Sequence, residues 1–587
     1  MKKKKVLIGY DDFVALLENS GYFVDKSLLI KELIDKPNQV TLITRPRRFG
    51  KSLNFSMLKY FWENTECRVA NSLLHHDVSH LFSDLAISAA GEEYMKEQGQ
   101  FPVIFLSFRG AKMNVWEDTA RMLIFEIARE FKRHQYLLRG ELLSPAEKEK
   151  YGELMNEYGS LAAYSQGILV LSGHLNRYFG KNVIVLIDEY DTPIQQGYLK
   201  NYFEPVLNFF RTFLVEGLKG NDCLQRAVIT GIMKVAQESV FSSFNNPSVS
   251  TITDLDFADK FGFTESEVNE FLETFDLGER FQDVKSWYNG YIFGKVHNIY
   301  NPWSITKYIY DKGHFLKPYW VNTSDNELIG EALQMDTIKS KGTLKKLIRG
   351  EEVREVIVQN IVYRDITTEF RAGWNFLLQS GYLKASDPIH VNDELSYNLQ
   401  IPNVEVRALM KSMVMSWFSK TESVHEEMEE LVIYLQEENW PLFEDRLQEI
   451  FDAIISYYDT ASVHPRKKKA ERIKYENFYH GLFLGLLVQL QDTYTIESNR
   501  EYGLGRPDLV VLPHSKDRTA IIFEFKAIKT TDLQIPEEAA QEALEQCDKK
   551  KYATGLKAKG YTTFQVIGIG FKGKELKMLW EQVHNKT

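Results

Sequence analysis

Residues 39–52 read QVTLITRPRRFGKS, and this stretch decides the fold of the first part of the chain. The apolar run at its start predicts a buried strand, and the spacing of apolar residues after Ser52 predicts a helix. The loop between them matches the GxxxxGK[ST] pattern from Gly50 onward, while Arg45 stands in the place of the first glycine. Because the pattern requires a strand before the loop and a helix after it, the sequence predicts a phosphate-binding loop.

Such a loop binds a nucleotide through the backbone N–H groups at the start of its helix, where the helix dipole also favours negative charge. Lys51 would reach the β- and γ-phosphates, and Ser52 would bind Mg²⁺. A basic surface turn is the alternative interpretation when the loop is taken alone. The residues that we expect to contact the nucleotide are Arg47, Arg48, Phe49, Gly50, Lys51 and Ser52. Arg47 and Arg48 could instead face a partner.

Two further strands end in polar residues that suit the same chemistry. The apolar run 182–187 ends at Asp188 and Glu189, which fits a Mg²⁺-binding aspartate beside a glutamate that polarises the attacking water. Another apolar run ends at Thr230, where a hydroxyl could sense the γ-phosphate. Solvation of a strand end, or capping of the next helix, is the alternative for the acid pair. The three motifs in this order favour ATP and Mg²⁺ as ligands.

The composition indicates a multi-domain globular protein. The chain has 587 residues, of which 44% are hydrophobic and 26% charged, so long disorder and collagen-like repetition are excluded. We expect no membrane span, no signal peptide and a cytoplasmic location. The net charge of −10 argues against coating nucleic acid through bulk charge, but a local basic groove stays open. The cysteines are too few and too scattered for a disulfide framework or a CxxC metal site: Cys67, Cys223 and Cys547.

The order of the expected elements indicates two separate α/β units. Strand-like runs alternate with helical stretches up to about residue 260, which predicts a mainly parallel sheet. A helical, aromatic-rich region follows. Beyond a basic run at 464–474, a helix at 475–490 precedes two strands, a helix at 537–552 and a last strand at 565–571. Two sheets imply two chemistries.

The second unit carries a constellation that suits a metal-dependent phosphodiesterase. Asp508 and Glu524 lie sixteen positions apart, which is enough for one hairpin to place them on adjacent strands. Because strand side chains alternate, Glu524 and Lys526 leave the same face. The two carboxylates and the Phe525 carbonyl could hold Mg²⁺ or Mn²⁺, with Glu476 as a third carboxylate. Lys526 could orient the attacking water and stabilise charge on the phosphorane.

Other observations around this constellation leave alternatives open. One alternative is that Asp508 and Lys526 form a structural salt bridge in a nuclease-derived fold that has lost its activity. His480 lies one turn after Glu476, although a histidine satisfied within its helix is favoured. The basic run lies directly before Glu476 and could contact backbone phosphates without reading sequence. Gln541 and Gln546 follow on the next helix.

Several motifs together resemble a known family. They are FVDKS at 23–27, TRPRRFGKS at 44–52, LIDEYD at 186–191, FGFT at 261–264, WYNGY at 287–291, YNPWS at 300–304 and YWVNT at 319–323. In these motifs the chain is similar to the bacterial AAA-ATPase-like family with a TRPRRFGK loop, in which Arg45 is a family feature. Asp25 and Lys26 would then lie near the nucleotide base, and a surface turn is the alternative. Members typically carry a C-terminal PD-(D/E)XK nuclease-like domain, whose pattern Asp508, Glu524 and Lys526 match.

The resemblance implies an α/β fold class: an N-terminal P-loop AAA-type NTPase with a parallel sheet, a helical middle region and a C-terminal restriction-endonuclease-like domain. The expected parts are 1–260 (ATPase core), 261–345 (helical lid or extension), 346–465 (helical connecting region) and 466–587 (nuclease-like domain).

The expected function is ATP hydrolysis coupled to a Mg²⁺-dependent nuclease, with DNA favoured over RNA as the partner. The alternatives are a nucleotide-dependent switch that binds without cutting, and an ATP-driven remodeller. A homo-oligomer stays open, since AAA-type sites often take an arginine from a neighbouring subunit. Arg226 and Arg211 are candidates for that arginine, neither better than a surface or packing arginine.

Overall fold

The computed structural model divides the chain into two compact units, Met1–Ala408 and Leu409–Thr587. The boundary falls inside the expected 346–465 region, and the other expected boundaries stay predictions. Among the residues described, no helix is long and apolar enough to cross a bilayer. The described residues are 4–64, 77–234, 244, 246–320, 343–344, 346–348, 350–357, 370–391, 393–410, 430–454, 494–498, 502, 505–516, 518–528, 533–573 and 575–584.

The first unit is built on a five-stranded parallel sheet with the order β2-β3-β4-β1-β5. All residues of β1 and β3 are buried, as expected for strands covered on both faces. The parallel sheet predicted from the alternation of strands and helices is therefore confirmed. Its strands are β1 Val40–Thr44, β2 Val103–Ser107, β3 Val183–Asp188, β4 Leu224–Gly231 and β5 Ser248–Ser250.

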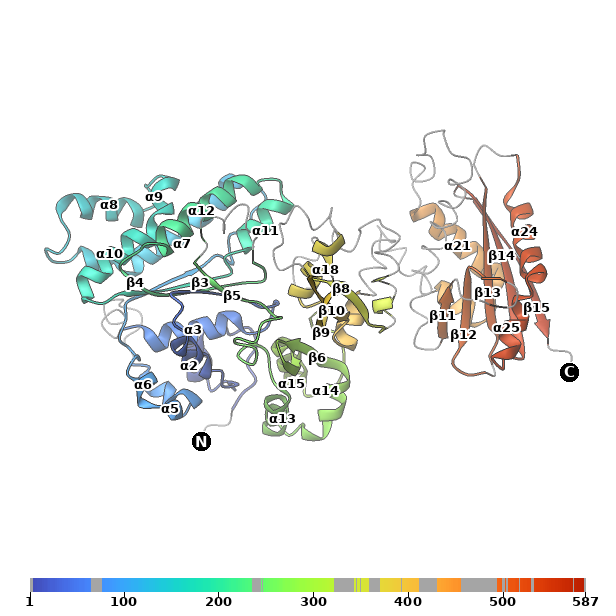
Figure 1. Cartoon of the computed structure of the whole chain (residues 1–587), viewed down its shortest axis with the longest axis horizontal. Coiled ribbons are helices and arrows are strands. Elements are labelled where there is room, and N and C mark those ends of the chain that lie inside the picture. Colours follow the sequence, from blue (N-terminus) through green and yellow to red (C-terminus); the bar gives the residue numbers. More distant parts are fainter. Residues whose placement is uncertain are drawn as a thin grey trace. The chain divides into compact units, whose positions relative to one another are not determined.

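Helices cover both faces of this sheet (Figure 1). On one side, α2 and α3 pack against it, with Phe55 and Leu58 of α3 sharing a core with Leu186 and Val228 of the sheet. On the other side lie α7, α10 and α12. The helices are α1 Phe13–Glu18, α2 Leu28–Asp35, α3 Lys51–Trp62, η1 Ser79–Phe82, α5 Ala86–Ala90, α6 Glu92–Met95, α7 Trp116–Arg133, η2 Gln135–Leu138, α8 Pro145–Met155, α9 Leu161–Ser165, α10 Gly167–Phe179, α11 Thr192–Leu199 and α12 Phe203–Leu218.

The region after β5 contains short helices and two small sheets. A hairpin, β6 with β7, lies among the helices, and β8, β10 and β9 form an antiparallel sheet in that order. The middle region, which we expected to be helical, also contains these two small sheets, and β9 and β10 pair over most of their length. The elements are α13 Glu265–Thr274, η4 Gly278–Arg280, α14 Phe281–Tyr288, β6 Asn289–Phe293, β7 Val296–Tyr300, α15 Pro302–Tyr310, β8 Val353–Val356, α18 Phe370–Gln379, β9 Lys384–Val391 and β10 Glu394–Gln400.

The second unit is built on a mixed five-stranded sheet in chain order, β11 to β15. Only β13 and β14 run parallel, and α24 and α25 connect them. Strands β11 and β15, which flank the expected ones, were not predicted, and the expected helix 475–490 lies outside the described residues. The elements are α21 Trp440–Ile454, β11 Tyr494–Ser498, β12 Leu509–Pro513, β13 Ala520–Ile528, α24 Pro536–Lys549, α25 Tyr552–Ala558, β14 Thr563–Lys572 and β15 Glu575–His584.

The two faces of this sheet pack against different helices. Alternate side chains of β13, such as Phe523 and Phe525, enter a core with α21, and the side chains between them face α24. Helix α24 lies close to β14: a Cβ on Gly568 would stand 2.4 Å from the Ala540 carbonyl oxygen. Because Gly568 is the register partner of Glu524, this close approach holds α24 over the strand that carries the predicted acid.

Candidate functional site

The predicted phosphate-binding loop lies between the carboxyl end of β1 and the start of α3. Gly50 has φ +81°, a conformation that favours glycine, and a Cβ placed there would meet nothing within 4 Å. Gly50 also precedes the first residue of α3 and has no side chain to cap the helix. The first N–H groups of α3 are therefore left to bind an anion, as the sequence predicts.

Lys51 and Ser52 lie at the start of α3. The Lys51 ammonium donates to the carbonyl oxygens of Arg45 and Pro46, at 3.1 and 3.0 Å, and its burial lowers its pKa. The Ser52 hydroxyl donates to Asp188 Oδ2 at 2.7 Å, which joins the loop to the end of β3. The structure thus brings together the lysine, the hydroxyl and the first acid that the sequence predicted as one site.

The Asp188 carboxylate has the environment of a cation ligand. Its side chain is buried, and its Oδ1 atom has no hydrogen-bond partner among the described residues. Burial, reinforced by the charge of Glu189, raises its pKa to about 6. A buried carboxylate with one free oxygen beside a serine hydroxyl is a donor set that Mg²⁺ favours. The residues present therefore fit the predicted magnesium ion.

Glu189 and Thr230 occupy different positions relative to the loop. Glu189 lines the pocket beside the loop, has φ +51° and accepts a hydrogen bond from the Thr192 hydroxyl at 3.3 Å. The Thr230 hydroxyl is buried and donates to the Ile43 carbonyl oxygen at 3.0 Å. It is directed into the sheet, and Thr230 is not among the residues that line the pocket.

The remaining predicted loop residues fix the loop to its surroundings. Phe49 is buried and packs edge-on against Tyr291 of β6, with ring centroids 5.0 Å apart. The Arg48 guanidinium stacks over Trp303 at 4.0 Å from the ring centroid. Arg47 donates to the Gln195 side chain of α11 at 3.1 Å. The side chain of Phe49 anchors the loop, and both arginines line the same pocket.

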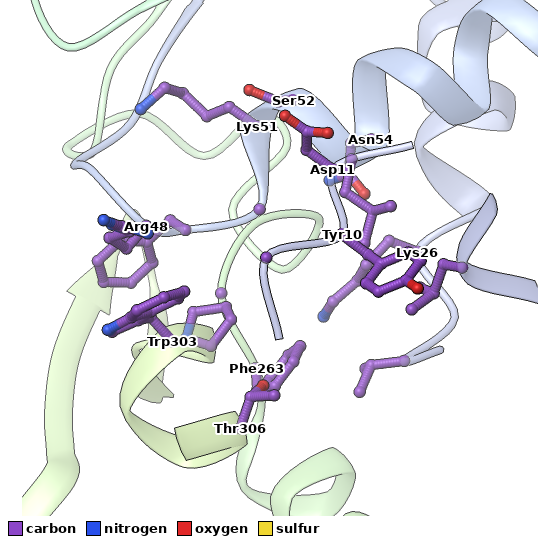
Figure 2. Close-up of a pocket in the computed structure, with 18 of the residues that line it drawn as sticks. Tyr10, Asp11, Lys26, Arg48, Lys51, Ser52, Asn54, Phe263, Trp303 and Thr306 are labelled. Carbon is purple, nitrogen blue, oxygen red and sulfur yellow. The ribbon is translucent and has the colours of Figure 1, made fainter. Parts of the chain in front are cut away.

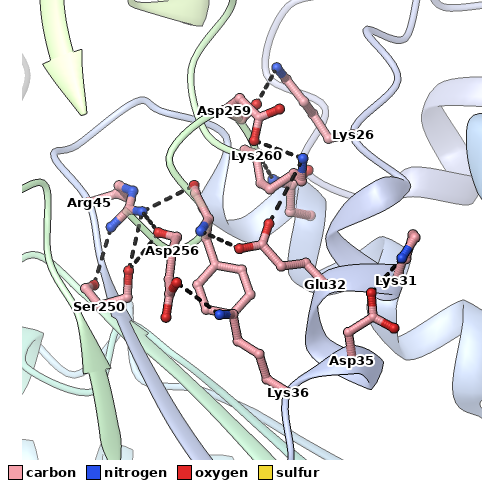
Figure 3. Close-up of polar contacts among 12 residues, drawn as sticks. Lys26, Lys31, Glu32, Asp35, Lys36, Arg45, Ser250, Asp256, Asp259 and Lys260 are labelled. Atoms are coloured by element: carbon pink, nitrogen blue, oxygen red, sulfur yellow. Dashed lines mark hydrogen bonds and ion pairs between the residues drawn. The ribbon is translucent and has the colours of Figure 1, made fainter. Parts of the chain in front are cut away.

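Arg45 has a structural role, which explains an arginine where the general pattern has glycine. Its side chain is fully buried and burial lowers its pKa to about 10. It donates to backbone carbonyls of Thr44, Ser250, Asp256 and Phe257 at 2.8 to 3.2 Å, and Figure 3 shows it reaching toward Ser250 and Asp256. The side chain thereby joins the end of β1 to the end of β5.

A pocket of about 440 Å³ lies over the loop, within the size range of ligand sites. In Figure 2, Lys51, Ser52 and Asp11 lie at one end and Phe263 and Thr306 at the other. The charged end suits phosphates. The ring of Phe271 lies 6.1 Å from that of Phe263 and stacks on Tyr22 at 4.3 Å, so the end around Phe263 is aromatic and suits a base.

Lys26 and Asp25 differ in their relation to this pocket. Lys26 lines it, but its ammonium is paired with Glu267 at 2.6 Å. The same ammonium donates to the Asp259 carbonyl oxygen at 2.9 Å (Figure 3). Asp25 accepts hydrogen bonds from the backbone N–H groups of Ser27 and Ala86. Lys26 therefore lies near the expected base, while Asp25 joins its own turn to the start of α5.

Arg109 and Asp11 are among the lining residues that the sequence interpretation missed. They form an ion pair at 2.5 Å. The signal was available for Arg109, since it follows a predicted strand and the carboxyl ends of parallel strands share one edge. Of the arginines that were considered, Arg226 donates to the Lys36 carbonyl at the opposite end of the sheet, and Arg211 donates to Asn208 within α12.

The second predicted site forms where β12 and β13 stop pairing. The last paired residues are Leu509 and Phe523. One residue earlier, Asp508 Oδ2 accepts the Phe525 N–H at 2.8 Å, and the Asp508 N–H donates to Glu524 Oε2 at 3.3 Å. Since the N–H and C=O of a strand residue point the same way, the Phe525 carbonyl is on the Asp508 side. Each predicted carboxylate thus accepts a backbone N–H of the segment that carries the other.

Helix α24 completes the described part of this site. The Gln546 amide donates to Glu524 Oε1. Burial raises the pKa of Asp508, and the charge of the neighbouring Lys526 lowers it by a smaller amount. Glu524 is almost fully buried, so its carboxylate needs charge or hydrogen-bonding partners. Glu476, His480 and the basic run 464–474 lie outside the described residues. Within those described, no three acidic, histidine or cysteine side chains gather around a metal position.

Comparisons with known proteins agree with the division of the chain into two parts. Residues 7–241 match the family described as "Predicted AAA-ATPase", and residues 474–581 match the PD-(D/E)XK nuclease superfamily. These matches confirm the two-part architecture predicted from the motifs: the chain carries an ATPase-like part and a nuclease-like part.

Two similar proteins extend over much of the chain. An uncharacterized protein from the vnfD 5′ region of Azotobacter chroococcum mcd 1 is 25% identical over 582 residues, which cover 97% of each chain. The Walker-type ATPase PABY2304 of Pyrococcus abyssi matches with 12% identity and a TM-score of 0.33, over 66% of this chain and 96% of its own.

Proposed function

We propose that this protein hydrolyses ATP and couples nucleotide state to a Mg²⁺-dependent nuclease that acts on nucleic acid, with DNA favoured over RNA. The observation that carries the nuclease assignment is the meeting of Asp508 and Glu524 where their strands diverge, with Lys526 on the face of Glu524. Two acids restrained in this way, with Glu524 buried and Asp508 half-buried, have a clear use as a ligand set for a hard cation.

In the ATPase part, the proposal assigns the nucleotide to the pocket over the loop. Lys51 would exchange its two carbonyl partners for phosphate oxygens, and the N–H groups of α3 would bind the β-phosphate. Glu189 would orient the attacking water. Ser52 and Asp188 would hold Mg²⁺, which in such sites neutralises charge on the phosphates.

In the nuclease part, Asp508, Glu524 and the Phe525 carbonyl would hold Mg²⁺ or Mn²⁺, which in such sites polarises the phosphodiester and lowers the pKa of a bound water. Lys526 would orient the water and stabilise negative charge on the phosphate. Gln546 holds one oxygen of Glu524, so the carboxylate keeps one orientation. Glu476 is kept as a proposed third carboxylate.

Contacts of the loop support the coupling. Phe49 and Arg48 contact Tyr291 and Trp303, which lie in the region that follows residue 261. A loop that moves when a phosphate binds would move these aromatic side chains with it. We therefore propose that nucleotide state repositions the region 261–345 and so controls access to the second site.

The test is incubation of the full chain with plasmid DNA, oligonucleotide DNA and RNA, with Mg²⁺ or Mn²⁺, and with ATP, ADP or no nucleotide. Wild type should cut, and Asp508→Ala should not. Asp548→Ala, on the exposed face of α24, is the matched control and should cut like wild type. Equal cleavage rates with ATP, with ADP and without nucleotide would contradict the proposed coupling.

A nucleotide-dependent binding protein is the second candidate. Both oxygens of Glu524 hold hydrogen bonds within the fold, as in a carboxylate with a structural role. This candidate predicts that wild type and Asp508→Ala both bind nucleic acid in a gel-shift assay and that neither cuts it. ATP hydrolysis would still be observed.

A further inference from the structure

We propose that Arg109 contacts the terminal phosphate of ATP from within the same chain, so that hydrolysis needs no arginine from a second subunit. This inference rests on the proposed ATPase function and adds a residue to it. An arginine that reaches the terminal phosphate stabilises the charge that develops there during transfer.

The position of Arg109 follows from the register of β2 and β3. Ser107 is the register partner of Asp188, and the Phe108 N–H donates to the Asp188 carbonyl oxygen at 3.0 Å. Arg109 is the next residue, so its backbone leaves the sheet beside Glu189. Both Arg109 and Glu189 line the pocket over the loop.

The sheet order places Arg109 and Lys51 on opposite sides of the expected phosphates. Lys51 follows β1, Arg109 follows β2, and β3 and β4 lie between those strands. The Ser52–Asp188 hydrogen bond directs the loop toward the end of β3, where the terminal phosphate would lie. A cation on each side of that phosphate is the arrangement that phosphoryl-transfer sites use.

Arg109 is held at its present position by an ion pair that is half-exposed to solvent. Arg47 is bonded to α11, and Arg48 is stacked on Trp303. Arg109 pairs with Asp11, and the side chains of this pair are 54% and 49% exposed. Because a half-exposed ion pair is weak, a phosphate with two or more charges can take the guanidinium from Asp11.

The step that Arg109 would assist is balanced without a further reactant. The water oxygen forms a bond to the γ-phosphorus while the bond from that phosphorus to the β–γ bridging oxygen breaks. The electron pair of the broken bond goes to ADP. One proton of the water stays on the inorganic phosphate, and the other leaves through Glu189 to solvent. Arg109 donates hydrogen bonds to the phosphoryl oxygens and is unchanged at the end.

The experiment measures ATP hydrolysis and nucleotide binding by the full chain. Arg109→Ala should lower kcat by about a thousandfold, at the lower end of the effect of such arginines. Affinity for ADP should stay within about twofold, because ADP lacks the contacted phosphate. Arg109→Lys should recover only part of the rate, since lysine keeps the charge but lacks the planar fork. Arg121→Ala, an exposed arginine on α7, is the matched control and should hydrolyse ATP like wild type.

A mixing experiment separates action within one chain from action between chains. Arg109→Ala mixed with Lys51→Ala should hydrolyse ATP no faster than the two measured separately. Restored hydrolysis in the mixture would overturn the inference, and so would a kcat of Arg109→Ala within about threefold of the wild-type kcat. Either result would leave the ATPase proposal standing. If wild type itself hydrolyses no ATP, the proposed function and this inference both fall.

Discussion

Replacement of Asp188 by asparagine should change the pH dependence of folding stability. Asp188 is buried, and its pKa is raised from 3.8 to about 6. A native pKa above the unfolded one means that the native state binds the proton more tightly, so stability falls as the pH rises from about 4 to 6. With 1.36 kcal/mol for each pKa unit, ionised Asp188 costs about 3 kcal/mol above pH 7 and about half of that near pH 5.

The assay is urea unfolding of the full chain, without nucleotide or metal, at about pH 5 and about pH 7.5. The stability of Asp188→Asn minus that of wild type should rise by about 1.4 kcal/mol between these two pH values, because only wild type gains the buried charge. Taking the difference between two proteins cancels the titration of all groups that do not interact with Asp188. Asp118→Asn, which removes an exposed carboxylate of α7, is the matched control and should show no such rise.

A pH-independent difference between wild type and Asp188→Asn would refute the reasoning, since it would mean that the pKa of Asp188 is the same in the native and unfolded states. Addition of Mg²⁺ with an ATP analogue should stabilise wild type at about pH 7.5, because a cation offsets the buried charge. The same addition should increase the stability of Asp188→Asn much less.

Three further substitutions test particular contacts. Arg45→Ala should destabilise the first unit by about 3 kcal/mol or more, because it leaves buried carbonyl groups without donors; urea unfolding followed by near-UV circular dichroism measures this. Gly568→Ala should destabilise the second unit by about 1–3 kcal/mol through the clash with α24, with ATP hydrolysis unchanged. Glu405→Ala should be less stable than Glu405→Gln, because Glu405 accepts from the Ser304 hydroxyl and from the Tyr319 and Trp320 N–H groups; thermal melts compare the two.

Each of these three substitutions has a control variant or an outcome that would contradict it. Arg45→Met should not restore stability, since methionine fills the space but cannot donate. Gly152→Ala, on α8, adds a Cβ that meets nothing within 4 Å and should be neutral or slightly stabilising. Equal stability of the two Glu405 variants would mean that its three donors find other partners.

The sequence by itself determined the phosphate-binding loop and both acid clusters. Local rules were sufficient, because strand, loop and helix are contiguous in 39–52, and because the two-residue period of a strand puts Glu524 and Lys526 on one face. The meeting of Asp508 with Glu524 was also predictable, since a hairpin joins strands that are near in sequence.

Only the tertiary structure decided what depends on residues distant in sequence. The role of Arg45 requires β5, about two hundred positions away, and the place of Arg109 requires the order of the strands in the sheet. Strand β15 and the sheet of β8, β9 and β10 were missed because pairing, and not local propensity, stabilises such strands. Side-chain pattern reports the nearest neighbours along the chain, whereas burial, pairing and charge at a site are set by elements that folding brings together.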